Sequence, residues 1–233
     1  MKAGGPNYTA CFLNFHDRPA TTVERRDAVE NADLATLAAR LDPSQAEDAR
    51  LLRALASYDR AWRDEFSQEH DHLRLVGQDN LRRYLPFLEV LVRIEPSDTR
   101  FEVFARAAAA RATGARVLAS YAPGCSEALL DELDAATAPW AGGIEMMEET
   151  DDELVAHFEN ARLLRVRYAD RDRVGPAVRE AANRLGLWPA DVPVVGEGRV
   201  ELLWYVREQS ISYDYHRYGN LGPRADERRR AVL

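Results

Sequence analysis

Cysteine is scarce in this chain: its 233 residues include only Cys11 and Cys125, which stand far apart and form no CxxC pair. That scarcity argues against a disulfide scaffold and against a zinc site. The N-terminus lacks a basic segment followed by an apolar run, and no apolar stretch approaches the length of a membrane span. We therefore expect a soluble protein in the reducing cytoplasm.

Basic residues are fewer than acidic ones: the chain has 31 Lys and Arg against 39 Asp and Glu. The net charge is −8, the isoelectric point is near 5.3, and 46% of the residues are hydrophobic, which is enough for a core. Such a chain has no electrostatic reason to bind nucleic acid or an anionic membrane, and we expect neither as a partner. The one basic stretch, RADERRR at 224–230, is predicted to be a frayed and solvated C-terminal tail.

Strand and helix patterns alternate through about a hundred residues from position 87. Alternation of this kind predicts βαβ units, right-handed crossovers and a mainly parallel sheet covered by helices on both faces. The predicted fold is therefore α/β and Rossmann-like, with five strands. The strands are expected at 88–94, 116–121, 143–147, 163–168 and 192–195.

Helix signals mark the elements around these strands. Ser44 with Glu47, Thr99 with Glu102, and Thr150 with Glu153 have the spacing of a capping box, and Gly186 is suited to end a helix. After Ser44, one apolar stripe predicts a long helix that packs on the rest of the chain. The stripe consists of Leu51, Leu55, Tyr58, Trp62 and Phe66. Residues 67–86 are predicted to be an irregular connector.

Each end of the chain also contains a strand-like run. At the N-terminus, a turn in residues 1–7 leads into Tyr8–Phe15. Near the C-terminus, Ile211, Tyr213 and Tyr215 alternate with polar residues, which is typical of a half-buried strand. An aromatic strand of this kind has an edge that needs pairing. Either a partner completes it by β-addition or it pairs within its own chain, and the two terminal strands could also pair with each other.

Glycine is missing where a dinucleotide would need it. The turn after the first strand, residues 95–102, has no glycine and three acidic side chains, and the turn at 121–128 has a single glycine. The third turn, residues 147–153, is strongly acidic. A bound pyrophosphate requires close backbone approach at a helix N-terminus, and carboxylates oppose it. We predict a nucleotide-binding shape without cofactor-binding residues.

Candidates for chemistry are few, and each has a structural interpretation. Cys125 follows Pro-Gly at an expected helix start, but a small cap residue explains it. His70 and His72 resemble a metal pair without further ligands at a matching spacing, which indicates a solvated loop. The acidic run Glu145–Glu153 lacks the pattern of a calcium loop and suits a helix N-terminus. We assign no catalytic and no metal-binding residue.

The two ends carry a family resemblance. KAGGPNY at 2–8 resembles the segment that closes the aldehyde dehydrogenase domain of glutamate-semialdehyde dehydrogenases, including the bifunctional proline utilisation A enzymes. VREQSIS at 206–212 resembles the C-terminal segment of the longer proline utilisation A proteins, although YDYHRYGN then departs from the family's small, Ala/Gly-rich run. The matching residues are Lys2, Gly4, Gly5, Pro6, Tyr8, Arg207, Glu208, Ser210 and Ser212. The connector residues Gly77, Asn80, Arg83 and Pro86 also fit in order.

The resemblance implies a non-catalytic module that covers the dehydrogenase domain, supports assembly and helps to roof the passage between two active sites. The parent enzyme would oxidise L-glutamate γ-semialdehyde with NAD, and its catalytic Cys and Glu lie upstream of KAGGP. The implied divisions are a dehydrogenase remnant at 1–43, a helix and connector at 44–86, a Rossmann-like domain at 87–198, and a C-terminal segment at 199–233.

Two other hypotheses remain beside this one. The chain could be a stand-alone Rossmann-like domain that binds NAD or another small ligand at the strand C-termini. It could also be an independent enzyme that uses Cys125 or His72. Under the leading hypothesis it has no cofactor of its own, and its partner is the parent's dehydrogenase domain or a second copy of itself.

Overall fold

The computed structural model describes residues 29–160, 165–216 and 219–229, with no account of the side chains at 159 and 160. The motif residues Lys2 to Tyr8 and the predicted strand Tyr8–Phe15 lie outside the described residues. Within the described residues, no helix combines the length and the apolarity needed to cross a bilayer.

A parallel sheet of four strands organises the body of the molecule, in the order β4-β3-β2-β5. The predicted α/β architecture is confirmed, but the fifth strand at 192–195 is wrong. Pro193 has no N–H for a ladder, and the Val195 backbone instead bonds to the Glu201 carboxylate and the Tyr58 hydroxyl. The strands are β2 (Glu89–Ile94), β3 (Arg116–Tyr121), β4 (Ile144–Glu148) and β5 (Val166–Arg167).

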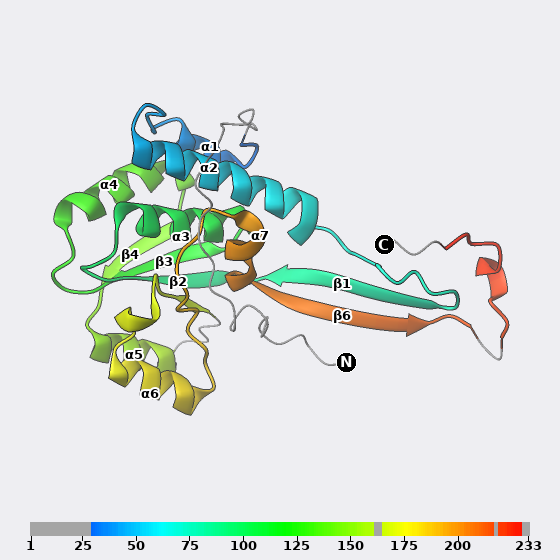
Figure 1. Cartoon of the computed structure of the whole chain (residues 1–233). Helices are drawn as coiled ribbons and strands as arrows, with labels where there is room; N and C mark the ends of the chain where they lie inside the picture. The colour runs from blue at the N-terminus through cyan, green and yellow to red at the C-terminus, as the bar shows by residue number, and fades with distance from the viewer. Residues whose placement is uncertain (1–28, 161–164, 217–218, 230–233) are drawn as a thin grey trace.

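Helices cover both faces of this sheet, as Figure 1 shows. One face carries α1 (Ala32–Ala38), α2 (Ala46–Ala61), α3 (Arg100–Ala112) and α4 (Glu127–Thr137), and the other carries α5 (Asp151–Asn160) and α6 (Pro176–Leu185). The short helix α7 (Gly198–Glu201) lies against α2.

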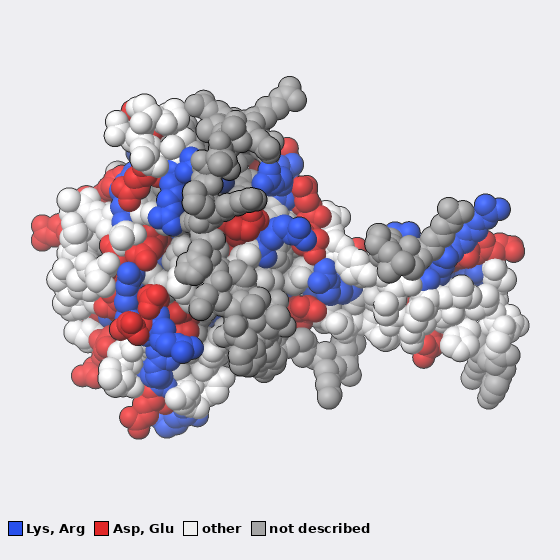
Figure 2. All heavy atoms as spheres, viewed as in Figure 1, with Lys and Arg blue, Asp and Glu red and all other residues white. Residues whose placement is uncertain are grey.

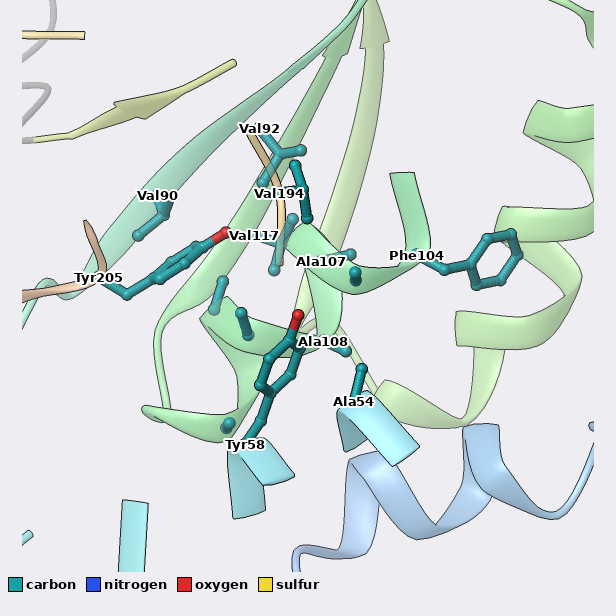
Figure 3. Packing of buried hydrophobic residues seen from close by; sticks show 14 of the residues in the cluster. Ala54, Tyr58, Val90, Val92, Phe104, Ala107, Ala108, Val117, Val194 and Tyr205 are labelled. Carbon is teal, nitrogen blue, oxygen red and sulfur yellow. The ribbon is translucent and has the colours of Figure 1, made fainter. Parts of the chain in front are cut away.

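The core divides between the two faces because β2 alternates its side chains. Val90 and Val92 enter the larger cluster, in which Tyr58 of α2 and Ala108 of α3 also pack (Figure 3). Leu91 points to the opposite face and packs in the smaller cluster between the sheet, α5 and α6. All of these side chains are buried.

Two of the three predicted capping boxes are confirmed. Thr99 and Glu102 bond reciprocally at the start of α3, and Thr150 and Glu153 do so at the start of α5. Gly186 ends α6 in the left-handed region, at φ 67°. The box at Ser44 is wrong, because the preceding turn takes its donor: the Ser44 backbone N–H bonds to the Asp42 carboxylate at 2.9 Å. Helix α2 begins one residue later, at Ala46, without a side-chain cap.

A two-stranded antiparallel ribbon projects from the body (Figure 1). It consists of β1 (Gln78–Pro86) and β6 (Val206–Asp214), which pair along their whole length. The predicted C-terminal strand is confirmed, and it pairs with β1 of its own chain. The expectation of an irregular connector at 67–86 is wrong. Neither face of β1 is fully buried, so its sequence lacks the apolar alternation that identifies a strand.

Candidate functional site

The carboxyl edge of the parallel sheet is the place where open α/β sheets bind ligands. In this protein three arginines occupy it. Arg93 comes from the end of β2, Arg167 from the end of β5 and Arg106 from α3, and at most 1% of each residue is exposed. A buried guanidinium is costly unless its donors are satisfied, so the partners of each arginine determine what this edge can do.

Arg93 ties three strands together. Its Nη1 donates to the Ser120 hydroxyl at 3.0 Å and to the Glu149 carbonyl at 2.7 Å, at the ends of β3 and β4. Its Nε donates to Glu95 at 2.8 Å and its Nη2 to Asp151 at 3.1 Å. The guanidinium therefore lies across the strand ends. Burial raises the pKa of Glu95, and the hydrogen bond from Arg93 opposes that shift.

A second group of charges fills the turn between β2 and α3. The Asp98 carboxylate is buried and bonds on one side to Arg106 and on the other to Arg173, the latter at 2.6 Å. Arg106 also donates to the backbone carbonyls of Arg93 and Arg167. Arg173 reaches Glu102 at 2.9 Å. The turn that would hold a pyrophosphate is thus occupied by the protein's own ion pairs.

The third pair, Arg167 with Glu201, is fully buried. The Arg167 guanidinium donates to both carboxylate oxygens of Glu201, at 2.9 and 3.1 Å. Glu201 also accepts from the Tyr205 hydroxyl at 3.0 Å and from the Val195 backbone N–H at 3.2 Å. Burial, and next the charge of Glu201, raise the pKa of Tyr205 well above its ordinary value. This pair joins β5 to α7 and to the start of the ribbon.

The acidic turns are therefore not the unpaired charges that the sequence suggested. Glu95, Asp98 and Glu102 each bond to an arginine, and Asp151 bonds to Arg93. Figure 2 shows the same mixture at the surface, where acidic and basic side chains alternate on the visible face of the body. The carboxyl edge of the sheet is therefore filled by the protein's own charged side chains.

We expect acid to weaken this network through Glu102. Burial opposes ionisation of Glu102, but hydrogen bonds from Arg173 and Thr99 together hold its pKa below the ordinary value. A lowered pKa adds stability that is fully present above the unfolded-state pKa of about 4.3 and disappears as the pH falls through the folded value. Urea unfolding between neutral and strongly acidic pH should show this loss.

The matched test of that assignment uses two arginines in the same loop. Arg173→Met should make the acid-dependent fall in stability shallower. Arg171→Met should leave it unchanged, because the Arg171 side chain is 76% exposed and lies 3.9 Å from its nearest carboxylate, Asp191. Identical pH profiles for wild type and Arg173→Met would contradict the role given to Glu102.

The other candidates for chemistry are not assembled into a site. Burial, reinforced by the charges of Glu95 and Asp98, raises the pKa of Cys125, which is the opposite of an activated thiol. His70 bonds to the Glu65 carbonyl, and His72 lies near Arg82. Among the described residues, no group of three or more His, Cys, Asp or Glu could hold a metal ion.

The acidic run Glu145–Glu153 is only partly a solvated helix start. Glu153 caps α5 as expected. Glu149 is 8% exposed and bonds to His157 at 3.0 Å, and Glu145 pairs with Arg116. The prediction of a helix N-terminus holds, but most of these carboxylates have partners.

The motif residues near the C-terminus lie on the ribbon. Arg207, Glu208, Ser210 and Ser212 all lie on β6, and Ser212 pairs with the connector residue Asn80 of β1. The Ser212 hydroxyl donates to Asn80 at 3.0 Å, and Arg83 donates to Gln209 at 2.6 Å. Two stretches more than a hundred residues apart thus form one element. Large apolar side chains are exposed around its far end: Leu73, Leu75, Val76 and Tyr213.

The C-terminal tail is bound to the end of the ribbon, so the prediction of a frayed tail is wrong for residues 219–229. Arg224 and Arg229 both bond to Asp79, and their guanidinium groups lie 3.8 and 5.1 Å from the centre of the Tyr215 ring. Arg229 also donates to the Gln78 carbonyl at 3.0 Å. The hydrogen bond from Arg224, supported by the one from Arg229, lowers the pKa of Asp79 against the opposing effect of burial.

Loss of this contact should loosen the ribbon end. We expect Arg229→Gln to increase amide hydrogen exchange several-fold at residues 75–80 and 212–216, because it removes one of the two charges that face Asp79. Arg228→Gln is the control, since none of the contacts to Asp71, Asp79 or Gln78 involves Arg228. Exchange mass spectrometry measures both, and equal exchange in the two variants would contradict the assignment.

The chain matches no protein-family model and no curated protein. Its α/β fold is similar to part of the fold of an aldehyde dehydrogenase. Succinic semialdehyde dehydrogenase from Streptococcus pyogenes, whose structure holds NADP+ as the cofactor, superimposes with a TM-score of 0.50 at 15% identity, over 68% of this chain and 36% of that one.

Two structures of proline utilization A are also similar to this chain. That from Corynebacterium freiburgense has a TM-score of 0.46 and 22% identity over 88% of this chain and 16% of its own. That from Bdellovibrio bacteriovorus has a TM-score of 0.48 and 16% identity over 64% of this chain and 16% of its own. The chain thus spans between 16% and 36% of the lengths of these three structures.

Proposed function

We propose that this chain is a non-catalytic structural module of a glutamate-semialdehyde dehydrogenase of the proline utilisation A type. The observation that carries the proposal is the carboxyl edge of the sheet. The position where a dinucleotide would bind is filled by Arg93, Arg106 and Arg167 with their carboxylates. If the carboxyl edge of the sheet is not accessible to a cofactor, the module functions by binding other proteins through its surface.

The ribbon is the surface that we assign to docking. It projects from the body, and Val76 and Tyr213 near its far end are 65% and 62% exposed. Exposed apolar side chains that gather on one element are typical of a protein interface. The partner is the catalytic dehydrogenase domain, which in this account oxidises L-glutamate γ-semialdehyde with NAD. The sequence resemblance at 2–8 and 206–212 supports that assignment.

The experiment mixes this chain with the dehydrogenase part of a proline utilisation A enzyme. We expect a complex in size-exclusion chromatography and altered aldehyde oxidation. Tyr213→Asp should weaken the complex because it places a charge on the docking surface. Leu185→Asp is the control, since Leu185 is 39% exposed on α6, away from the ribbon. No association and no change in activity would refute the proposal.

A second candidate function is that of a small dinucleotide-binding domain. One observation favours it: the chain shares its fold with a structure that holds NADP+. The occupied carboxyl edge opposes it. Titration with NAD+ separates the two candidates, because only a dinucleotide-binding domain would saturate.

A further inference from the structure

Four oxygen atoms from four different elements accept hydrogen bonds from the Arg93 guanidinium. Its Nε donates to Glu95 at 2.8 Å, just after β2, and its Nη2 donates to Asp151 at 3.1 Å, at the start of α5. Its Nη1 donates to the Ser120 hydroxyl of β3 at 3.0 Å and to the Glu149 carbonyl after β4 at 2.7 Å. All three nitrogens of this planar cation are therefore used.

These oxygens are held in place by bonds that do not involve the Arg93 side chain. Ser120 lies within β3, between the ladders to β2 and β4. The Glu149 N–H donates to the Tyr121 carbonyl at 3.0 Å, and the capping box at the start of α5 fixes the turn that carries Asp151. Because a rigid surrounding collapses only partly around a truncated side chain, shortening Arg93 should leave a cavity lined by acceptors.

An unpartnered hydroxyl lies beside the same acceptors. Tyr168 is fully buried, and its hydroxyl has no hydrogen-bond partner among the described residues. Burial raises the pKa of Tyr168, and the charges of Arg93, Asp151 and Glu95 follow as further influences on it, so the hydroxyl lies near that ion cluster. A buried polar group without a protein partner points to a ligand or a water molecule at that place.

The cluster is open to solvent on its acidic side. The side chain of Asp151 is 42% exposed and that of Glu95 is 17% exposed, whereas the Arg93 side chain is 1% exposed. A small ion can therefore reach the position of the guanidinium past these two carboxylates. Two ionised acceptors favour a cation there, because hydrogen bonds between charged partners are the strongest kind.

We propose that the carboxyl edge of the sheet is a binding site for a guanidinium ion, which Arg93 fills from within the chain and an external guanidinium fills when that side chain is shortened. Its charge preference is opposite to that of a dinucleotide site, which binds an anion. The N–H groups of an ammonium ion radiate from one nitrogen, so it cannot reach oxygens that meet three different nitrogens. The proposal does not rest on docking to a dehydrogenase, and its test needs this chain alone.

The test is rescue of Arg93→Ala, followed by urea unfolding with circular dichroism. We expect guanidinium chloride up to about 10 mM, far below denaturing concentrations, to raise the urea midpoint of the variant to a plateau. Methylammonium chloride and sodium chloride at equal concentration should not do so, and the filled site of the wild type should not respond. If Arg93→Ala is unfolded in buffer, guanidinium should restore its native spectrum. Neither a rise nor a restoration, or an equal response to methylammonium, would overturn the proposal.

Three further variants locate the bound ion. Arg116→Ala also frees two carboxylates, but the Arg116 side chain is 47% exposed, so guanidinium should not stabilise this variant. Adding Asp151→Asn to Arg93→Ala should raise the guanidinium concentration for half of the effect several-fold. Adding Asp152→Asn should leave it unchanged, because the hydrogen bond of Arg93 reaches Asp151 and Asp152 is exposed. Equal responses of the two double variants, or rescue of Arg116→Ala, would contradict the site.

Discussion

Arg167→Met should lower the free energy of unfolding by about 3–5 kcal/mol, because it strands the Glu201 carboxylate in the interior. Neither side chain is exposed to solvent, and two hydrogen bonds of 2.9 and 3.1 Å join Arg167 Nη2 to the Glu201 carboxylate. After the substitution, the remaining partners of Glu201 among the described residues are the Tyr205 hydroxyl and the Val195 N–H. Urea unfolding followed by circular dichroism measures the loss.

Two further variants make this result specific. Arg116→Met removes an arginine that also bridges two carboxylates, Glu89 and Glu145, but its side chain is 47% exposed. It should cost less than about 1 kcal/mol. The double variant Arg167→Met with Glu201→Leu removes both buried charges and should recover most of the loss. If Arg167→Met and Arg116→Met lowered the free energy of unfolding equally, burial would not determine how much an ion pair contributes to stability.

Gly198→Ala should lower the free energy of unfolding by about 1–3 kcal/mol, because α7 packs directly on the backbone of α2. A Cβ at this position would lie 2.4 Å from the Ser57 carbonyl oxygen and 2.7 Å from its carbon, neither of which can move aside as a side chain would. The Gly198 N–H also donates to the Ser57 hydroxyl at 2.9 Å. Thermal or urea unfolding gives the value.

The comparison is with Gly186→Ala at the end of α6. There a Cβ would meet nothing within 4 Å, and the cost comes only from the left-handed φ of 67°. It should be about 1–2 kcal/mol. The two variants should also differ in where amide exchange changes: Gly198→Ala should increase exchange in α2, and Gly186→Ala should not. An unperturbed α2 in Gly198→Ala would contradict the close packing.

Much of the fold could be predicted from local signals. The alternation after residue 87 identified four of the strands, and the reciprocal bonds at Thr99 and Thr150 depend on residues only three positions apart. The strand β1 could not be identified in this way, because neither of its faces is fully buried and its partner β6 lies more than a hundred residues later. Only the paired register shows why Asn80 and Ser212 belong together.

Only the acidic residues of the candidate site could be predicted from the sequence. The sequence places the carboxylates of Glu95, Asp98 and Glu102 in one turn. It does not identify the arginines that bond to such carboxylates, because Arg173 is 75 residues from Asp98, and Arg167 is 34 residues from Glu201. An arginine in an apolar strand such as LLRVRY was the available signal, since a buried charge requires a partner.

The tail shows the same limitation. The composition of RADERRR alone predicts a basic and solvated end. Its function in the fold depends on Asp71 and Asp79, about 150 residues earlier, and on the ring of Tyr215. Charge pairing over such distances follows from the topology of the ribbon, which places the chain end beside β1.

We propose that the arginine network excludes a dinucleotide from the carboxyl edge of the sheet, where open α/β sheets bind ligands. Isothermal titration of this chain with NAD+ and NADH tests it most directly. We expect no saturable heat with either nucleotide, and the same result for an Arg116→Met control. Saturable binding at micromolar concentration, weakened by a substitution at Arg93 that leaves the fold intact, would contradict it.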